Sequence, residues 1–176
     1  MAGTLFSALD KKAALLAFVI GLLTILAAWA SQIWGGLVPC ELCLGERVPY
    51  YWGLPILAVV LLLWNRLPLT VWYIAMLIVG AIFVWSIYLG VFHAGVEWKF
   101  WPGPTACTGN GTSLDLNQLN NLNAVKIVQC DQVQWSFLGI SLAGYNALVS
   151  LVMVVLIAIA LIDQYRRGRS RSAVAA

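Results

Sequence analysis

The chain has 176 residues, the length of one ordinary domain, so a single domain over residues 1–176 is expected. It is 62% hydrophobic and only 10% charged. Soluble globular domains carry roughly 25% charged residues, so this composition excludes an ordinary soluble protein and predicts an integral membrane protein in a lipid bilayer. The net charge of +3 gives no indication of nucleic-acid binding, and no nucleic-acid partner is expected.

Four apolar segments are long enough to cross a bilayer, which takes about 20 residues. In chain order they cover about residues 13–33, 48–64, 69–92 and 140–162. The second is short and contains Pro49 and Pro55, which a membrane helix tolerates near its start or where neighbouring helices satisfy the freed carbonyl groups. The sequence therefore predicts an all-α membrane protein built as a four-helix transmembrane bundle.

The first segment contains Ala28-Trp29-Ala30 before Ser31, which looks like a signal-peptidase site preceded by the basic residues Lys11 and Lys12. A signal-peptide core has about 7–15 apolar residues, and this segment is longer. We therefore expect an uncleaved membrane anchor.

Basic residues near the ends of the spans predict the orientation. Seven of them fall at the N-terminus, between the second and third spans, or at the C-terminus: Lys11, Lys12, Arg66, Arg166, Arg167, Arg169 and Arg171. The other two connections, about residues 34–47 and 93–139, hold only Arg47, Lys99 and Lys126. Because cytoplasmic flanks carry the excess of basic residues, both termini are expected in the cytoplasm and both of these connections outside.

The long outer segment contains apolar residues at a spacing near the helical period, with Asn and Gln between them: Leu116, Leu119, Leu122, Val125 and Val128. Ser113 and Asp115 are candidate caps for the start of a helix there. The pattern predicts a short amphipathic helix, lying either on the membrane surface or on the bundle as an ordinary loop helix.

All four cysteines fall in the outer segments, whereas cysteines used as small apolar filler would be scattered into the spans. Cys40 and Cys43 form a C-x-x-C pair, whose small ring stabilises little chain and whose usual uses are redox exchange or metal binding. Cys107 and Cys130 would close a much longer loop. A purely structural disulfide, contributing about 3–4 kcal/mol, is therefore a serious alternative for that pair.

Metal binding is another interpretation of the cysteines. Zinc takes four ligands, and the four cysteines, or three of them with His93, would supply these. Against zinc, the second pair lacks the close spacing of a zinc knuckle, and the compartment outside a bacterial inner membrane oxidises thiols. A structural membrane protein with two stabilising disulfides is the third possibility.

Two polar residues lie near the C-x-x-C pair. Arg47 follows Cys43 by four residues, so in a helix both lie on one face, where a guanidinium favours the reactive thiolate. The plainer interpretation of Arg47 is a snorkelling arginine at the membrane interface. His93, the only histidine, ends the third span at the same outer end, where it either donates to a bound acceptor or is a hydrated interfacial residue.

Taken in order, these motifs resemble the bacterial disulfide bond formation protein B family, DsbB. The resemblance rests on Pro39-Cys40-Glu41-Leu42-Cys43-Leu44-Gly45-Glu46-Arg47, on Trp101-Pro102-Gly103-Pro104-Thr105-Ala106-Cys107, and on Cys130 followed by Gln134-Trp135-Ser136-Phe137-Leu138-Gly139. It implies a multi-pass protein of the bacterial inner membrane whose cysteines face the periplasm. It also implies a protein-dithiol:quinone oxidoreductase that reoxidises a periplasmic DsbA-like thiol oxidase and passes the electrons to ubiquinone or menaquinone.

The resemblance also implies roles for individual residues. Cys107 would form the mixed disulfide with the partner, and Cys130 would exchange with Cys40. Cys43 would face the quinone with Arg47 beside it, and His93 would lie nearby. Three tryptophans are expected either to wall the quinone pocket or to form an interface belt: Trp29, Trp34 and Trp52. The aromatic segment over residues 95–101 departs from the best-known members, which leaves a dedicated thiol partner open.

Overall fold

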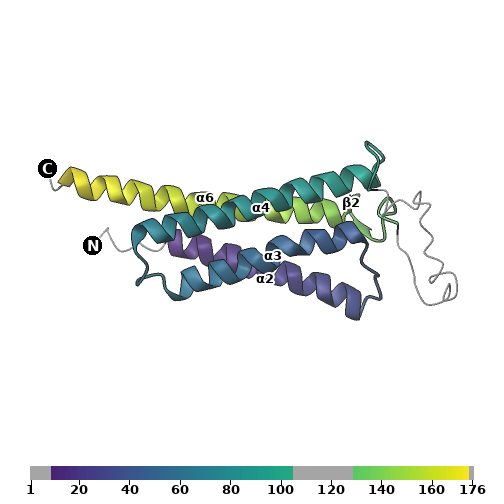
Figure 1. Ribbon diagram of the computed structural model, residues 1–176, viewed down its shortest axis with the longest axis horizontal. Helices are drawn as coiled ribbons and strands as arrows, with labels where there is room; N and C mark the ends of the chain where they lie inside the picture. The colour runs from purple at the N-terminus through teal and green to yellow at the C-terminus, as the bar shows by residue number, and fades with distance from the viewer. Residues whose placement is uncertain (1–8, 105–128, 175–176) are drawn as a thin grey trace.

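The computed structural model describes residues 9–104 and 129–174, with side chains through Arg167. In this part of the chain, four long helices run side by side along one axis: α2 (Leu9–Ile33), α3 (Glu41–Leu62), α4 (Leu69–Glu97) and α6 (Leu142–Val174) (Figure 1). The start of α2, the end of α6 and the α3–α4 connection lie at one end of the bundle, and the α2–α3 connection lies at the other (Figure 1). The predicted all-helical bundle is confirmed.

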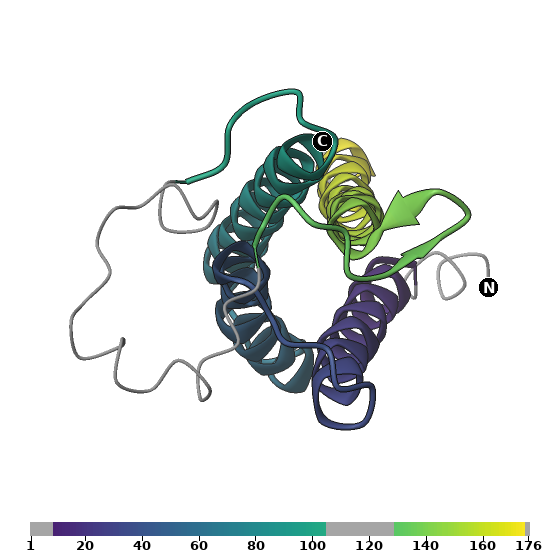
Figure 2. The same cartoon turned by 90° about the vertical axis from the view of Figure 1, so that its right-hand side faces the viewer.

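Seen end-on, the helices form a ring in the order α2, α3, α4, α6, and each packs against its two neighbours in that ring (Figure 2). Large apolar side chains that are almost fully buried fill its interior: Leu57, Met76, Phe83, Met153 and Ile157. Gly90 permits a close contact between α4 and α6, because a Cβ there would lie 2.8 Å from the backbone nitrogen of Ala147. The core therefore runs along the axis of the bundle.

Among the described residues, three helices are long and apolar enough to cross a membrane: Leu9–Ile33, Leu69–Glu97 and Leu142–Arg167. In each, only 28% of the most apolar stretch is buried inside the protein. Their outer faces carry large exposed apolar side chains, among them Leu23, Leu26, Leu77, Val84 and Leu151. Water would not solvate such a surface but lipid does, so the chain is a multi-pass membrane protein.

Helix α3 is not among these three helices. It carries Glu46 and Arg47 and runs through Pro49 and Pro55, so it is less apolar than its neighbours. Its place in the ring, between α2 and α4, is that of a fourth spanning helix. That the chain crosses the membrane four times remains a proposal. The position of α3 in the ring supports it, whereas the composition of α3 does not.

Helix α3 also begins at Glu41, earlier than the predicted start at residue 48. Cys40 is its N-cap, with extended backbone (φ −76°, ψ 172°), and its Sγ accepts a hydrogen bond from the backbone N–H of Cys43 at 3.2 Å. The spacing of the C-x-x-C pair is the spacing between an N-cap and the third helical residue, so the motif itself starts the helix.

Helix α4 continues past the predicted end at residue 92 and includes His93 and Glu97. The helix ends at Glu97, with Trp98 as its C-cap. Lys99 follows with a left-handed φ of 61°, its N–H donates to the carbonyl of Val96, and the N–H of Phe100 donates to the carbonyl of Gly95. This is a Schellman ending with a lysine where glycine is usual. His93 is therefore held inside a rigid helix.

A small hairpin, absent from the predicted elements, precedes α6. Strand β1 (Ser136–Phe137) pairs antiparallel with β2 (Ile140–Ser141). The two turn residues, Leu138 and Gly139, have φ of 50° and 79°, as a type I′ turn requires. Because β2 takes the first residues of the predicted fourth span, the helix starts at Leu142 instead of residue 140.

Helix α6 runs to Val174, well past the predicted end at residue 162. Arg167 pairs with Asp163 one turn earlier, at 3.1 Å, and also with Asp10 of α2. These ion pairs join the end of α6 to the start of α2.

Cys107 and the predicted amphipathic helix containing Leu116 and Val128 lie outside the described residues.

Candidate functional site

Three of the four predicted cysteines meet at the end of the bundle that lies away from the termini. Cys40 and Cys43 are free thiols in the first turn of α3, and Cys130 is disulfide-bonded. Cys40 and Cys130, exposed by 4% and 1%, are the buried centre of one small cluster, with Leu42 and Cys43 packed against it. A disulfide and a dithiol are thus held against each other inside one folded unit.

The N-terminus of α3 makes the two thiols unequal. Hydrogen bonds from the side chain and backbone of Cys43 lower the pKa of Cys40 below the usual thiol value, despite its burial. The same thiol–thiol hydrogen bond, together with burial, raises the pKa of Cys43. The helix dipole also favours an anion at this position. The resemblance placed the thiolate at Cys43, whereas in the dithiol form Cys40 ionises first.

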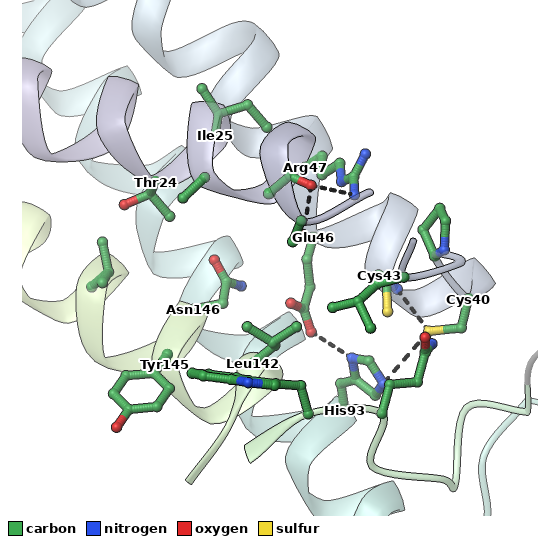
Figure 3. Close-up of a pocket in the computed structure, with 18 of the residues that line it drawn as sticks. Thr24, Ile25, Cys40, Cys43, Glu46, Arg47, His93, Leu142, Tyr145 and Asn146 are labelled. Carbon is green, nitrogen blue, oxygen red and sulfur yellow. Dashed lines mark hydrogen bonds and ion pairs between the residues drawn. The ribbon is translucent and has the colours of Figure 1, made fainter. Parts of the chain in front are cut away.

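His93 lies beside Cys40, between two acidic side chains (Figure 3). Its Nε2 is 3.7 Å from Cys40 Sγ, and its Nδ1 is 2.7 Å from a carboxylate oxygen of Glu46. Nε2 is also 3.9 Å from Glu97 Oε1, one helical turn further along α4. His93 is only 3% exposed, so it is not a hydrated interfacial residue. The Nδ1 contact to a carboxylate orients the imidazole and directs Nε2 at the sulfur.

Arg47 lies on α3 but reaches across to α2. Its guanidinium donates to Gln32 Oε1 at 2.7 Å and to the carbonyl of Ala28 at 3.2 Å, and it stacks over the ring of Trp29 at 5.5 Å. In the described part of the chain these bonds go to α2 and not to a cysteine sulfur. Arg47 is 8% exposed, which makes it a fixed, buried cation and not a freely snorkelling one.

A cavity of about 310 Å³ opens beside the dithiol and extends down between α2, α3 and α6. Its polar lining includes Cys43, Arg47, His93 and Asn146, and its apolar walls include Ile25, Ala28, Leu142, Tyr145 and Val149 (Figure 3). The tryptophan that contributes to the wall is Trp135. Trp34 and Trp52 are 85% and 67% exposed, which fits the interface belt instead.

The side-chain amide of Asn146, which lines this cavity, has an N–H donor that no described residue uses. Its Oδ1 accepts from the Tyr50 hydroxyl at 2.7 Å, whereas its Nδ2 is buried and makes no hydrogen bond to any described residue. A buried unsatisfied amide is costly, so this donor marks a place for a ligand acceptor. The sequence analysis missed Asn146, as it missed the roles of Glu46 and Glu97. For Glu97 a signal exists, since it follows His93 by four helical residues.

The cysteines and His93 also form a group that could hold a metal ion, because one ligand atom from each of Cys40, Cys43 and His93 lies within 4.8 Å of the others. The alternative with all four cysteines as ligands does not fit this structure, because the sulfur of Cys130 is bound in a disulfide.

Comparison with known protein families identifies the family of this chain. The family model described as disulfide bond formation protein DsbB matches residues 10–160, which include all four cysteines, Arg47 and His93. No curated protein matches the chain. The match covers all four helices in whole or large part, from the beginning of α2 to the apolar part of α6. The chain therefore belongs to the DsbB family of membrane oxidoreductases that act in disulfide formation.

Proposed function

We propose that this protein is a dithiol:quinone oxidoreductase of the bacterial inner membrane. It reoxidises a DsbA-like thiol oxidase in the periplasm and passes the electrons to a membrane quinone, either ubiquinone or menaquinone. The observation that carries this proposal is the packing of the disulfide-bonded Cys130 against Cys40, with the C-x-x-C pair at the head of a cavity. An exchange partner and an electron-acceptor site are thus both adjacent to one dithiol.

The thiol steps follow from this arrangement. The partner's dithiol reduces an outer disulfide between Cys107 and Cys130, with Cys107 as the sulfur attacked. The released Cys130 thiolate then attacks Cys40 of the oxidised inner pair, which breaks the Cys40–Cys43 bond and forms a Cys40–Cys130 bond. Each exchange forms one disulfide and breaks one, and it moves two electrons inward without any other reactant.

Cys43 becomes the reactive thiolate only at that point. Its high pKa in the dithiol form comes first from its hydrogen bond to Cys40, then from burial, and the charge of Cys40 adds to the effect. Once Cys40 is tied to Cys130, the hydrogen bond and the charge of Cys40 no longer raise the pKa of Cys43. Burial still raises it, and the charge of nearby His93 lowers it. The order of ionisation in the dithiol form is therefore compatible with Cys43 as the thiolate that faces the cavity.

The cavity suits a quinone head group. Its volume of about 310 Å³ falls at the lower end of the range for small-ligand sites, about 300–1,000 Å³. Asn146 Nδ2 supplies a buried donor that has no partner among the described residues, and Arg47 supplies a fixed cation. A quinone accepts the two electrons and two protons that a dithiol releases. His93, next to Cys40 and held by Glu46, is placed to carry a proton away from the thiol.

Quinone reduction by the purified full-length protein, supplied with a reduced DsbA-like oxidase, tests the proposal. We expect turnover by the unaltered chain and none by Cys40→Ser or Cys43→Ser, provided that both variants remain inserted and folded. Full activity in either variant would contradict the assignment. With Cys130→Ser, a mixed disulfide through Cys107 should persist, because the thiol that resolves it is gone.

The quinone site has its own test. A neutral hydrogen bond contributes about 0.5–1.5 kcal/mol, so Asn146→Ala should raise the KM for quinone by about twofold to tenfold. Ser86→Ala is the matched control, because the Ser86 hydroxyl accepts from Ser150 in the same buried polar region but does not line the cavity. An equal rise in KM for both variants would mean that the effect is structural and that Asn146 binds no quinone.

A further inference from the structure

We propose that the reduced C-x-x-C pair, together with His93, forms a binding site for a divalent metal ion of the zinc type, with Glu97 as the fourth ligand. The site would exist only in the dithiol state, because a disulfide sulfur is not a zinc ligand. This goes beyond the proposed function, since it needs neither a thiol partner nor a quinone.

The distances fit tetrahedral coordination. The ligand atoms of Cys40, Cys43 and His93 lie within 4.8 Å of one another, and Cys40 Sγ is 3.7 Å from His93 Nε2. With zinc–sulfur and zinc–nitrogen bonds of about 2.3 and 2.0 Å, tetrahedral ligands of these two kinds stand about 3.5 Å apart. These three side chains therefore need to move little to close around an ion, whereas Glu97 lies outside this group and its carboxylate must move toward the sulfur atoms to complete it.

Glu97 supplies an independent indication of a ligand. Its side chain is only 6% exposed and it lines the same cavity, with Oε1 at 3.9 Å from His93 Nε2. Its other oxygen, Oε2, is buried and has no hydrogen-bond partner among the described residues. A buried carboxylate oxygen without a partner is costly, and coordination of a cation would satisfy it.

The surroundings of His93 are those of a metal-binding histidine. A ligating imidazole nearly always donates its second ring nitrogen to a carboxylate or carbonyl, which fixes the tautomer. Here Nδ1 contacts Glu46 at 2.7 Å, which leaves Nε2 directed at the sulfur atoms. The same contact that orients His93 for proton transfer therefore prepares it to coordinate an ion.

Binding involves no redox change. The thiols of Cys40 and Cys43 lose their protons to solvent, two protons for each ion bound, and each sulfur forms a bond to the metal. While the ion is bound, neither sulfur is free to attack a disulfide or to be oxidised. Zinc would therefore inhibit the dithiol form reversibly, and a chelator would restore it.

The test uses the full-length chain with Cys107→Ser and Cys130→Ser, so that the inner pair supplies the only thiols. The protein is reduced with a phosphine, freed of reductant, and titrated with Zn²⁺ against a chromophoric chelator. We expect one zinc per chain in the dithiol form and none after oxidation to the Cys40–Cys43 disulfide. His93→Gln and Cys43→Ser should each weaken binding at least tenfold in this background.

Two carboxylate variants distinguish zinc binding at the proposed ligands from nonspecific attraction of the cation to negative charge. Loss of a carboxylate that supports a ligating histidine typically costs about tenfold to a hundredfold in affinity, which is the effect expected for Glu46→Gln. Glu41→Gln is the matched control, because Glu41 lies in the same motif but is exposed, and its zinc affinity should be unchanged. Equal zinc binding by the oxidised and reduced forms, or no loss in His93→Gln, would overturn the proposal.

This measurement is independent of turnover. If the chain reduces quinone but binds no zinc, the metal site is refuted and the proposed function stands. If it binds zinc as expected but reduces no quinone with any thiol partner, the proposed function fails and the metal site stands.

Discussion

Cys40 has two roles that depend on the same atom. Its sulfur caps α3 by accepting the N–H of Cys43, and that hydrogen bond together with the Cys43 side chain stabilises its own thiolate. One substitution therefore separates the cap from the nucleophile: Cys40→Ser keeps a capping oxygen and removes the redox chemistry. This is why serine, and not alanine, is the informative replacement at that position.

The unequal thiols predict a pH dependence. The thiolate is the form that alkylates, and a lowered pKa keeps Cys40 ionised at pH values where an ordinary thiol, with a pKa of about 8.5, is protonated. In the reduced protein, alkylation of Cys40 should persist below that range and be lost as pH falls through its lowered pKa. Cys43 should react only at higher pH.

Peptide mass spectrometry of the alkylated protein from pH 5 to 10 measures both profiles. The midpoints, and not the absolute rates, are compared, because Cys40 is more buried than Cys43. In detergent-denatured protein the two midpoints should coincide. A lower midpoint for Cys43 in the folded protein would contradict the role of the N-cap.

Arg47 should support the quinone step and not the exchange with the thiol partner. Its guanidinium is fixed against α2 beside the cavity. A hydrogen bond to a charged group contributes about 1.5–3 kcal/mol, so Arg47→Ala should cost about tenfold to a hundredfold in quinone affinity or rate. Arg47→Lys keeps the charge but loses the planar fork of donors, so it should cost less.

Steady-state assays over a range of quinone concentrations, alongside single-turnover exchange with the partner, separate the two steps. Arg66→Ala is the control, since Arg66 is exposed in the α3–α4 connection at the far end of the bundle. The role assigned to Arg47 is wrong if Arg47→Ala slows partner exchange and leaves the quinone dependence unchanged.

The sequence reveals the residues of this site better than their pairing. Cys40, Cys43, Arg47 and His93 could be selected from spacing and position alone, because each is a reactive or charged side chain at the end of an apolar segment. The contact between His93 and Glu46 could not, because it joins α3 to α4 and depends on how these helices are rotated in the ring. Asn146 was missed because a single amide in an apolar helix carries no pattern.

At the scale of the elements, the sequence predicted the four helices but not where they end. The apolar segments mark where lipid-facing side chains begin and stop, whereas a helix ends where its terminal N–H and C=O groups find other partners. Cys40 therefore caps the start of α3 before its apolar part, and α4 extends beyond His93 to Glu97, where the left-handed Lys99 follows its C-cap. Both extensions carry site residues, so the redox site is built on rigid helices where loops had been expected.

The contact between α4 and α6 gives a prediction about stability. At Gly90 a methyl group would lie 2.8 Å from the nitrogen of Ala147 and 2.9 Å from the carbonyl oxygen of Ala143, both backbone atoms that cannot rotate away. Overpacking of this kind costs about 1–3 kcal/mol, so Gly90→Ala should lower the midpoint of thermal unfolding in detergent.

Gly80→Ala is the matched control on the same helix. A Cβ there would meet only the Ile157 side chain, at 3.7 Å, which is an ordinary contact. Both substitutions gain the same helix propensity, about 1 kcal/mol, so any difference between them reports packing. Equal stability of the two variants would mean that α4 and α6 do not approach as closely as described.

At the scale of the whole molecule, the ring places the thiol chemistry and the ion pairs of Arg167 at opposite ends. Cys40, Cys43, His93 and Cys130 gather at one end, and the start of α2, the end of α6 and the α3–α4 connection lie at the other (Figure 1). The ion pairs of Arg167 with Asp10 and Asp163 close that second end. An even number of crossings is the arrangement that brings both ends of a chain to one side, which favours α3 as a fourth span.

Reporter fusions test this arrangement directly. Because basic residues gather at the end that holds both termini, that end is expected in the cytoplasm. A cytoplasmic reporter fused after Arg66 should therefore be active and one fused after Gly103 inactive, with the reverse for a periplasmic reporter. A fusion after Arg167 should behave like the one after Arg66.

A further fusion tests whether α3 crosses the membrane. If α3 failed to cross, the fusions after Arg66 and Gly103 would still differ, because α4 lies between them, but a fusion after Gly36 would match the one after Arg66. A difference between Gly36 and Arg66 thus establishes that α3 spans the membrane, and agreement between them would remove the fourth crossing.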